Sequence, residues 1–268
     1  MSGGWRPRLV VSDLDGTFLS PDGTVSDVNR GAVGDALEAG IEVLFATGRP
    51  PRWLDVVADL GLPSTVVIAS NGALVYDVAT DEVLRRRAIA TEVLRSVTAD
   101  VAAAVEAVDF AVEDSAVFRC TDDYVVRASA GTQIERLPTD RLAQVDGVVK
   151  LLVQHQRLTP DDLAALVEPV VGDRLTVTHS AADGWGLLEL SAPGVTKAST
   201  LADWCADRGI EAADVAAFGD MPNDRAMLAW VGRPHVMQHA HPSLADLGAT
   251  VIGSNLESAV GHTVRGWL

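Results

Sequence analysis

The sequence predicts an α/β protein with a doubly wound parallel sheet, interrupted by a smaller inserted α+β domain. Two observations lead to this fold. Short apolar segments alternate with helix-forming segments over residues 9–69, a rhythm that is typical of parallel sheets. The rhythm stops in the middle of the chain and returns near residue 187, as expected when one domain is inserted into another.

The N-terminal elements follow from apolar runs and from capping residues. Leu9 to Val11 form a buried strand, and Asp13 to Thr17 form the loop beyond it. Ser26 caps a helix that runs to Ala39, with Gly40 ending it. Further expected elements are a small hairpin at 18–24, strands at 41–46 and 65–69, and a helix from 50 to 61.

The middle of the chain follows a different pattern, in which no strand ends in a cluster of polar residues. The expected elements are extended segments at 73–76 and 83–88, helices at 91–108 and 160–167, and strands at 109–112, 117–120, 148–153 and 175–179. We therefore predict an inserted α+β domain at 87–183 and a core domain formed by 1–86 and 184–268. The core resumes with strands at 187–190, 215–218, 236–237 and 250–252 and a helix at 196–208.

Composition restricts the classes of partner. The chain has 268 residues, 48% of them hydrophobic, and a net charge of −16. Such an acidic protein repels phosphate backbones and anionic lipids, so we expect neither nucleic acid nor a membrane as partner. The two cysteines, Cys120 and Cys205, lie far apart, and no apolar run reaches the roughly 18 residues of a membrane span. We expect a cytoplasmic protein that is a monomer or a weak homodimer.

Polar side chains follow several expected strands at the point where each strand ends. They are Asp13, Asp15, Thr47, Asn71, Asp220, Asn223 and Asp224. Ligands bind at this edge of open α/β sheets, and neighbouring carboxylates suit a hard cation such as Mg²⁺. Asp13 and Asp15 alone could also form an ordinary turn beyond a strand.

Lys197 stands in the first turn of an expected helix, where a cation is electrostatically misplaced. A solvated surface lysine is the ordinary interpretation. A bound anion shared by Lys197 and the helix N-terminus is the alternative that points to function.

The sequence is identified as a member of the haloacid dehalogenase (HAD) superfamily on four ordered motifs. These are Asp13-Leu14-Asp15-Gly16-Thr17, Thr47-Gly48, Lys197, and Gly219-Asp220-Met221-Pro222-Asn223-Asp224. The long insert between the second and third motifs resembles the Cof-type subfamily with a type IIB cap. The segments Ser70-Asn71-Gly72-Ala73 and Pro193-Gly194-Val195-Thr196-Lys197 are similar to that subfamily as well. The resemblance implies a Rossmann-like core and a cap that selects the substrate.

The resemblance also implies roles for individual residues. Asp13 would be the nucleophile that forms an aspartyl-phosphate, and Asp15 the general acid and base. Mg²⁺ would be held by Asp13, Asp220 and the backbone carbonyl of Asp15, with support from Asp224. The implied phosphate-binding residues are Leu14, Thr47, Gly48, Lys197 and Asn223, and the candidates for substrate contact are Asn71 and Arg49.

One segment departs from the subfamily pattern. Gln238-His239-Ala240 stands where a Gly-Asn-Ala is usual. We interpret the nearby histidines, His235, His239 and His241, as part of a polar loop near the site rather than as a metal site.

The implied function is that of a Mg²⁺-dependent phosphatase of a small phosphorylated metabolite such as a sugar phosphate. A phosphomutase or phosphotransferase of the same superfamily is one alternative, since the same motifs serve both reactions. A non-catalytic metabolite-binding protein is another, which the intact pair Asp13 and Asp15 disfavours.

Overall fold

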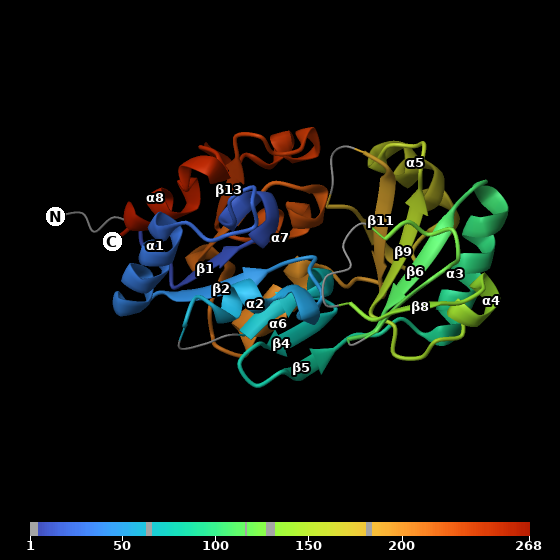
Figure 1. The fold of residues 1–268 in the computed structure, drawn as a ribbon. Helices are drawn as coiled ribbons and strands as arrows, with labels where there is room; N and C mark the ends of the chain where they lie inside the picture. The colour runs from blue at the N-terminus through green and yellow to red at the C-terminus, as the bar shows by residue number, and fades with distance from the viewer. Residues whose placement is uncertain (1–4, 63–65, 116, 127–131, 181–183) are drawn as a thin grey trace.

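The computed structural model describes residues 5–62, 66–115, 117–126, 132–180 and 184–268. Two sheets stand side by side in it, each with its own helices, and the C-terminus lies on the side of the larger one (Figure 1). The order of the larger sheet is β14 (Thr250–Ile252), β13 (Arg233–Met237), β12 (Val215–Gly219), β1 (Leu9–Ser12), β2 (Glu42–Ala46), β3 (Val66–Ala69), β4 (Leu74–Asp77) and β5 (Glu82–Arg86). The strands from β14 to β3 are parallel, and β4 and β5 are antiparallel additions.

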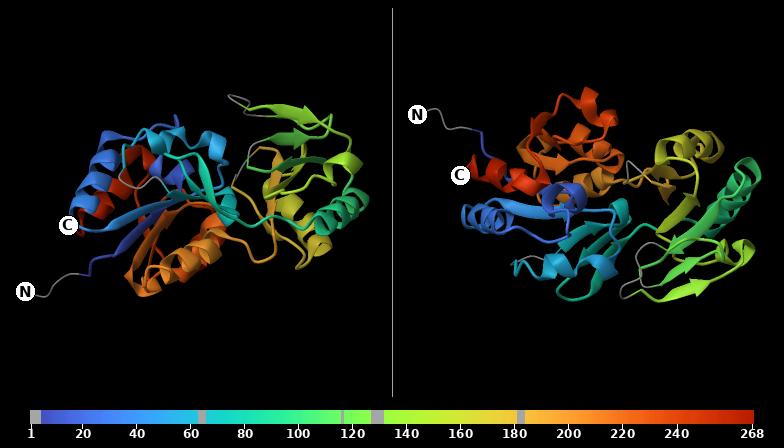
Figure 2. Two further views of the ribbon diagram at one scale, coloured as in Figure 1. Left: turned by 90° about the horizontal axis from the view of Figure 1, so that it is seen from below. Right: turned by 45° about the horizontal axis from the view of Figure 1, so that its top comes forward.

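Helices cover both faces of the larger sheet, which makes it doubly wound (Figure 2). Val10 of β1 packs on the side of α1 (Asp27–Glu38) and α8 (Ala259–Arg265). Its neighbours Leu9 and Val11 pack on the opposite side, with α6 (Lys197–Ala206) and α7 (Arg225–Trp230). This alternation follows from the pleat of a strand, which turns successive side chains to opposite faces.

The smaller sheet is mostly antiparallel. Its order is β10 (Thr176–Thr178), β11 (Gly186–Ser191), β9 (Lys150–His155), β6 (Asp109–Glu113), β7 (Phe118–Cys120) and β8 (Ile134–Arg136). The helices α3 (Thr91–Ala104), α4 (Thr139–Leu142) and α5 (Pro160–Val171) accompany it. The mixture of strands and helices predicted for the middle of the chain is therefore confirmed. Among the described helices, none combines the length and apolarity that crossing a lipid bilayer requires.

The prediction for the strand at 187–190 is wrong in its partner. We expected it in the larger sheet, but β11 pairs in the smaller one, with Leu188 opposite Val153 and Leu190 opposite Leu151. The reason is that an apolar run indicates that a strand is buried, but it does not indicate in which sheet the strand pairs. The predicted boundary at 183 falls on 181–183, outside the described residues. The division into a core of 1–86 and 184–268 and an insert of 87–183 stays a prediction, although 186–191 pairs with the insert.

Three local predictions also need correction. The helix expected from 50 to 61 is only a turn at Pro51–Trp53 followed by α2 (Asp55–Ala58), because Leu54 between them is not helical. The helix expected to reach residue 108 ends at Ala104, where the backbone becomes extended. The expected hairpin at 18–24 is a turn without strands. Separately, the strand predicted at 65–69 begins at Thr65, which lies outside the described residues.

The predicted helix starts at Ser26 and Thr196 are confirmed. Each side chain accepts a hydrogen bond from a backbone N–H in the first turn, from Asn29 in α1 and from Ser199 in α6. These caps supply partners for N–H groups that a helix start leaves unpaired. The cap at Thr196 fixes where α6 begins, and with it the position of Lys197.

Candidate active site

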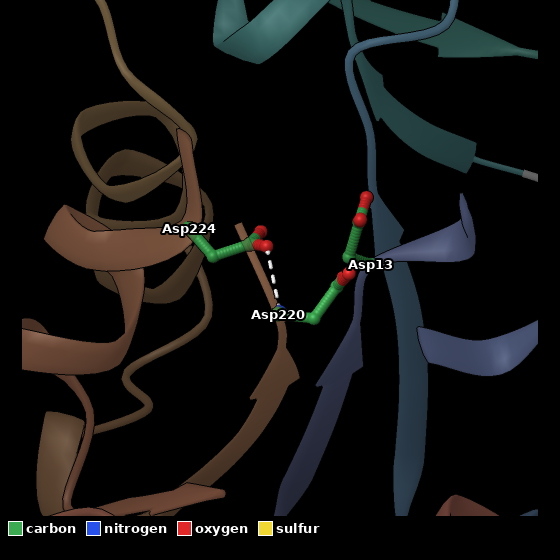
Figure 3. A group of neighbouring side chains, drawn as sticks. All are labelled: Asp13, Asp220 and Asp224. Atoms are coloured by element: carbon green, nitrogen blue, oxygen red, sulfur yellow. Dashed lines mark hydrogen bonds between the residues drawn. The ribbon is translucent and has the colours of Figure 1, made fainter. Parts of the chain in front are cut away.

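Three carboxylates converge at the carboxyl edge of the larger sheet. Asp13 follows β1, and Asp220 and Asp224 follow β12, the strand beside it (Figure 3). One oxygen from each lies within 4.8 Å of the others, and all three side chains are buried. Gly16 makes this approach possible, since it has a φ of 74° and a Cβ there would lie 2.2 Å from Asp220 Oδ2.

Lys197 is the cation of this cluster. It is fully buried, and its Nζ donates to Asp13 Oδ1 at 2.8 Å and to Asp224 Oδ1 at 2.7 Å. The interpretation of Lys197 as a surface lysine is therefore wrong. The second oxygen of Asp224 accepts the backbone N–H groups of Asp220 and Met221, both at 3.1 Å. Asp224 thus fixes the loop after β12 while it holds the ammonium.

The cluster carries more negative charge than Lys197 neutralises. Burial raises the pKa of Asp13 well above its usual range, and the charges of Asp224 and Asp220 add to this while Lys197 opposes it. Burial and Asp224 raise the pKa of Asp220 to about 7, although the Thr17 hydroxyl donates to it at 2.7 Å. Burial alone would lower the pKa of Lys197, but attraction by Asp13 and Asp224 outweighs it and the pKa is raised. A buried set of oxygen donors with excess negative charge fits a divalent cation such as Mg²⁺.

The Asp15 carboxylate stands apart from this cluster. It forms a two-pronged ion pair with Arg49, in which Nε and Nη2 donate at 2.8 and 2.6 Å. Arg49 also donates to the backbone carbonyl of Trp53 at 3.0 Å, and the Asp15 side chain is 59% exposed. Asp15, the expected general acid, is therefore paired with Arg49, the expected substrate contact, at the entrance of the site.

The remaining predicted residues surround the cluster. Thr47 is buried and its hydroxyl accepts the backbone N–H of Arg49 at 3.1 Å. Asn223 donates to Asn71 at 3.1 Å, and a Cβ on Gly48 would come within 3.2 Å of that Asn71 oxygen. Gly48, Asn71 and Asn223 therefore pack against one another beside the carboxylates.

Leu14 plays a different part from the other predicted phosphate contacts. Its side chain is buried in the hydrophobic core. Only its backbone is left for the predicted phosphate contact.

The three histidines do not converge. His235 lies within β13 and stacks on Phe218, with ring centroids 4.9 Å apart. His239 Nε2 is 2.9 Å from the Gly16 carbonyl oxygen, and His241 Nε2 is 3.3 Å from a carboxylate oxygen of Asp161 on α5. The polar-loop interpretation thus fails for His235, which is part of a strand.

The sequence reasoning missed a second buried charged cluster, which belongs to the smaller sheet. We call Glu113, Lys150 and Glu189, from β6, β9 and β11, the insert cluster; all three are buried. Lys150 Nζ donates to Glu189 Oε1 at 2.5 Å and, across to the core, to the Gly48 carbonyl at 2.6 Å. The available signal was a charged residue within or directly after each strand predicted from the sequence: Glu113 follows 109–112, Lys150 lies within 148–153 and Glu189 lies within 187–190.

Asp13 and Asp220 of the first cluster and all three residues of the insert cluster line one cavity of about 950 Å³. This volume lies within the usual range of sites for small molecules. The arrangement can hold an anionic group near the carboxylates and Lys197 while the rest of a ligand faces the smaller sheet.

Comparison with known proteins gives consistent matches over the whole chain. A family model described as haloacid dehalogenase-like hydrolase matches residues 10–264. The HMP-PP phosphatase of Enterobacter sp. (strain 638) is 32% identical over 97% of this chain and 96% of that protein.

Solved structures share the fold. The HAD subclass IIB sugar phosphatase BT4131 has a TM-score of 0.82 at 18% identity, covering 97% of this chain and 99% of that one. The phosphatase BT1666 from Bacteroides thetaiotaomicron has a TM-score of 0.81 at 19% identity, covering 100% of this chain and 97% of that one. The predicted fold class, a doubly wound core with an α+β cap, is confirmed by these likenesses.

Proposed function

The chain belongs to the haloacid dehalogenase-like hydrolases, and from this premise we propose that it hydrolyses a small phosphorylated metabolite through an aspartyl-phosphate, with Mg²⁺ as cofactor. The enzyme class predicted from the sequence, a phosphatase of this superfamily, is confirmed by the family match and by relatives named as phosphatases. The observation that carries the finer proposal is Asp13, buried at the end of β1 between Lys197 and two further carboxylates.

Asp13 acts as the nucleophile. Lys197 holds its Oδ1, and no described residue hydrogen-bonds to Oδ2, which is left to attack phosphorus. The ester P–O bond breaks as the Asp13 O–P bond forms, and the leaving oxygen takes a proton from Asp15. Asp15 then removes a proton from water, which attacks phosphorus, releases inorganic phosphate and restores the Asp13 carboxylate.

Asp15 must leave Arg49 to reach the leaving oxygen, because both of its carboxylate oxygens accept hydrogen bonds from the guanidinium. A phosphorylated substrate offers Arg49 another anionic partner. Arg49 therefore acts as a substrate contact that releases Asp15 when the site is filled.

The metal would be held by Asp13, Asp220 and the Asp15 backbone carbonyl. Asp224 supports the site, since its oxygens are already taken by Lys197 and by two backbone N–H groups. When bound, Mg²⁺ supplies positive charge that offsets the carboxylates and the phosphoryl oxygens. Lys197, Thr47, Gly48, Asn223 and the backbone of Leu14 would bind the phosphoryl group.

The substrate is small, with a sugar phosphate as the leading class. The cavity supports this proposal by its volume and by being covered from the side of the smaller sheet. The net charge of −16 disfavours nucleic acid. A cytoplasmic location and a monomeric or weakly dimeric state remain predictions.

The decisive test is turnover of a phosphomonoester panel by the purified protein. We expect release of inorganic phosphate in Mg²⁺, loss of activity on chelation, and recovery when Mg²⁺ is returned. Asp13→Asn should abolish turnover without lowering the melting temperature appreciably. Activity that survives exhaustive chelation, or a folded Asp13→Asn protein that keeps its rate, would contradict the proposal. Transfer of the phosphoryl group to a second sugar instead of water would identify a phosphomutase.

A further inference from the structure

Most, but not all, of the polar atoms in the insert cluster have a hydrogen-bond partner. Lys150 bonds Glu189 and the Gly48 carbonyl, and Glu189 Oε2 accepts from Asn71 Nδ2 at 3.1 Å. Attraction by Lys150 and hydrogen bonds from neighbours outweigh burial and lower the pKa of Glu189. The ion pair of Lys150 and Glu189 therefore joins the smaller sheet to the core loops.

Glu113 is the exception in this cluster. Its Oε1 accepts from Arg52, whereas its Oε2 accepts no hydrogen bond from any described residue although it is shielded from solvent. The nearest ammonium, that of Lys150, lies 3.8 Å away, beyond hydrogen-bond distance. A buried polar atom without a partner costs about 1–3 kcal/mol, so native proteins rarely keep one without a reason.

The position of Glu113 supplies the reason. It lines the same cavity as Asp13 and Asp15, together with the apolar side chains of Phe118 and Leu152. Apolar side chains combined with a few polar groups, as in this lining, are typical of sites that orient a small molecule. The acceptor belongs to the smaller sheet, so it faces the part of a ligand that lies away from the core carboxylates.

Charge restricts what this acceptor can bind. The carboxylates of Glu113 and Glu189 are matched by Arg52 and Lys150, which are already engaged. A second phosphate or carboxylate on the ligand would meet the Glu113 oxygen with no free cation from the insert cluster. A neutral donor, such as a hydroxyl, completes the site without changing its charge.

We propose that Glu113 determines substrate specificity, its Oε2 accepting a hydrogen bond from a hydroxyl on the leaving-group portion of the substrate. The proposal rests on the phosphatase function proposed above. It makes the enzyme selective for phosphorylated polyols and sugars over equally large esters without hydroxyls. A site that binds a hydroxyl through a buried polar group rejects analogues that lack it, because that group is then left unpaired.

The test compares two substrates in wild type and in Glu113 variants. One is the best hexose 6-phosphate of a panel, and the other is cyclohexylmethyl phosphate, which has a six-membered ring and no hydroxyl. We expect Glu113→Leu to lower kcat/KM for the sugar phosphate by roughly 10- to 100-fold. For cyclohexylmethyl phosphate the change should stay within about threefold, so the ratio of the two values collapses.

Two further variants make the result decisive. Glu113→Gln keeps the size and an oxygen for Arg52, so it tests the acceptor if Glu113→Leu fails to fold. It should lower the ratio by about tenfold. Glu135→Gln, on an exposed carboxylate of β8 that does not line the cavity, should leave the ratio unchanged.

Equal loss on both substrates in a folded variant would assign Glu113 a structural role and overturn the proposal. An unchanged ratio in an active enzyme would overturn it as well, while leaving the phosphatase function intact. Wild-type protein that hydrolyses no phosphomonoester in Mg²⁺ would overturn the proposed function and this inference together.

Discussion

Lys197→Met isolates the electrostatic balance of the active site. Methionine fills similar space, but it removes the one ammonium that Asp13 and Asp224 share. Both Lys197 and Asp224 have no solvent exposure, so water does not screen the loss. Removing one partner of a buried ion pair costs about 3–5 kcal/mol, because the remaining charge has no compensation.

We therefore expect a loss of about 3–5 kcal/mol in the free energy of unfolding in chelator, together with loss of turnover. Mg²⁺ should stabilise the variant more than the wild type, since a cation then replaces the missing charge. At a concentration 100 times the dissociation constant, binding contributes about 2.7 kcal/mol. The measurement is urea unfolding followed by circular dichroism, with and without Mg²⁺.

Two controls separate this effect from general damage. Lys197→Met combined with Asp224→Asn should recover on the order of 1–3 kcal/mol relative to additivity, because fewer buried charges remain. Arg265→Met, which removes a half-exposed partner of Asp35, should cost less than about 1 kcal/mol. A loss below about 1 kcal/mol for Lys197→Met in chelator would refute the electrostatic argument.

Three further outcomes are expected. Asp15→Asn should slow turnover by roughly 10²- to 10⁴-fold, less for aryl phosphates with good leaving groups; equal losses across leaving groups would contradict its role as acid. Gly72→Ala should lower the melting temperature far more than Gly61→Ala. Both glycines have a positive φ, but of the two only Gly72 would place its new Cβ against a backbone carbonyl oxygen, that of Thr196 at 2.2 Å. Similar losses in the two variants would contradict this steric argument. Glu189→Gln should cost about 3–5 kcal/mol at pH 7. Because the pKa of Glu189 is lowered in the folded protein, its contribution to the free energy of unfolding is present above the ordinary value of 4.5 and is lost as the pH falls through the folded pKa. The stability difference between the variant and the wild type should therefore shrink below pH 4.5 in urea unfolding. A difference that does not change with pH would exclude the ion pair with Lys150 as its cause.

Features that depend on neighbouring residues could be predicted from the sequence. Ser26 and Thr196 mark helix starts because a hydroxyl there reaches an N–H in the first turn. Asp13 and Asp220 were placed correctly at one edge, because the carboxyl ends of parallel strands meet there. The resemblance to a known family then supplied the chemistry of these positions.

Features that depend on distant partners were decided by the tertiary structure alone. The apolar run of β11 fits either sheet, and only its pairing with β9 assigns it to the smaller one. Asp15 pairs with Arg49 at the entrance of the site. Glu113 lines the cavity, and its Oε2 accepts no hydrogen bond from any described residue. Local pattern determines whether a side chain is buried and which element it lies on. The residue that a side chain contacts is determined by packing between segments far apart in the chain. A local sequence pattern carries no information about the energy of that packing.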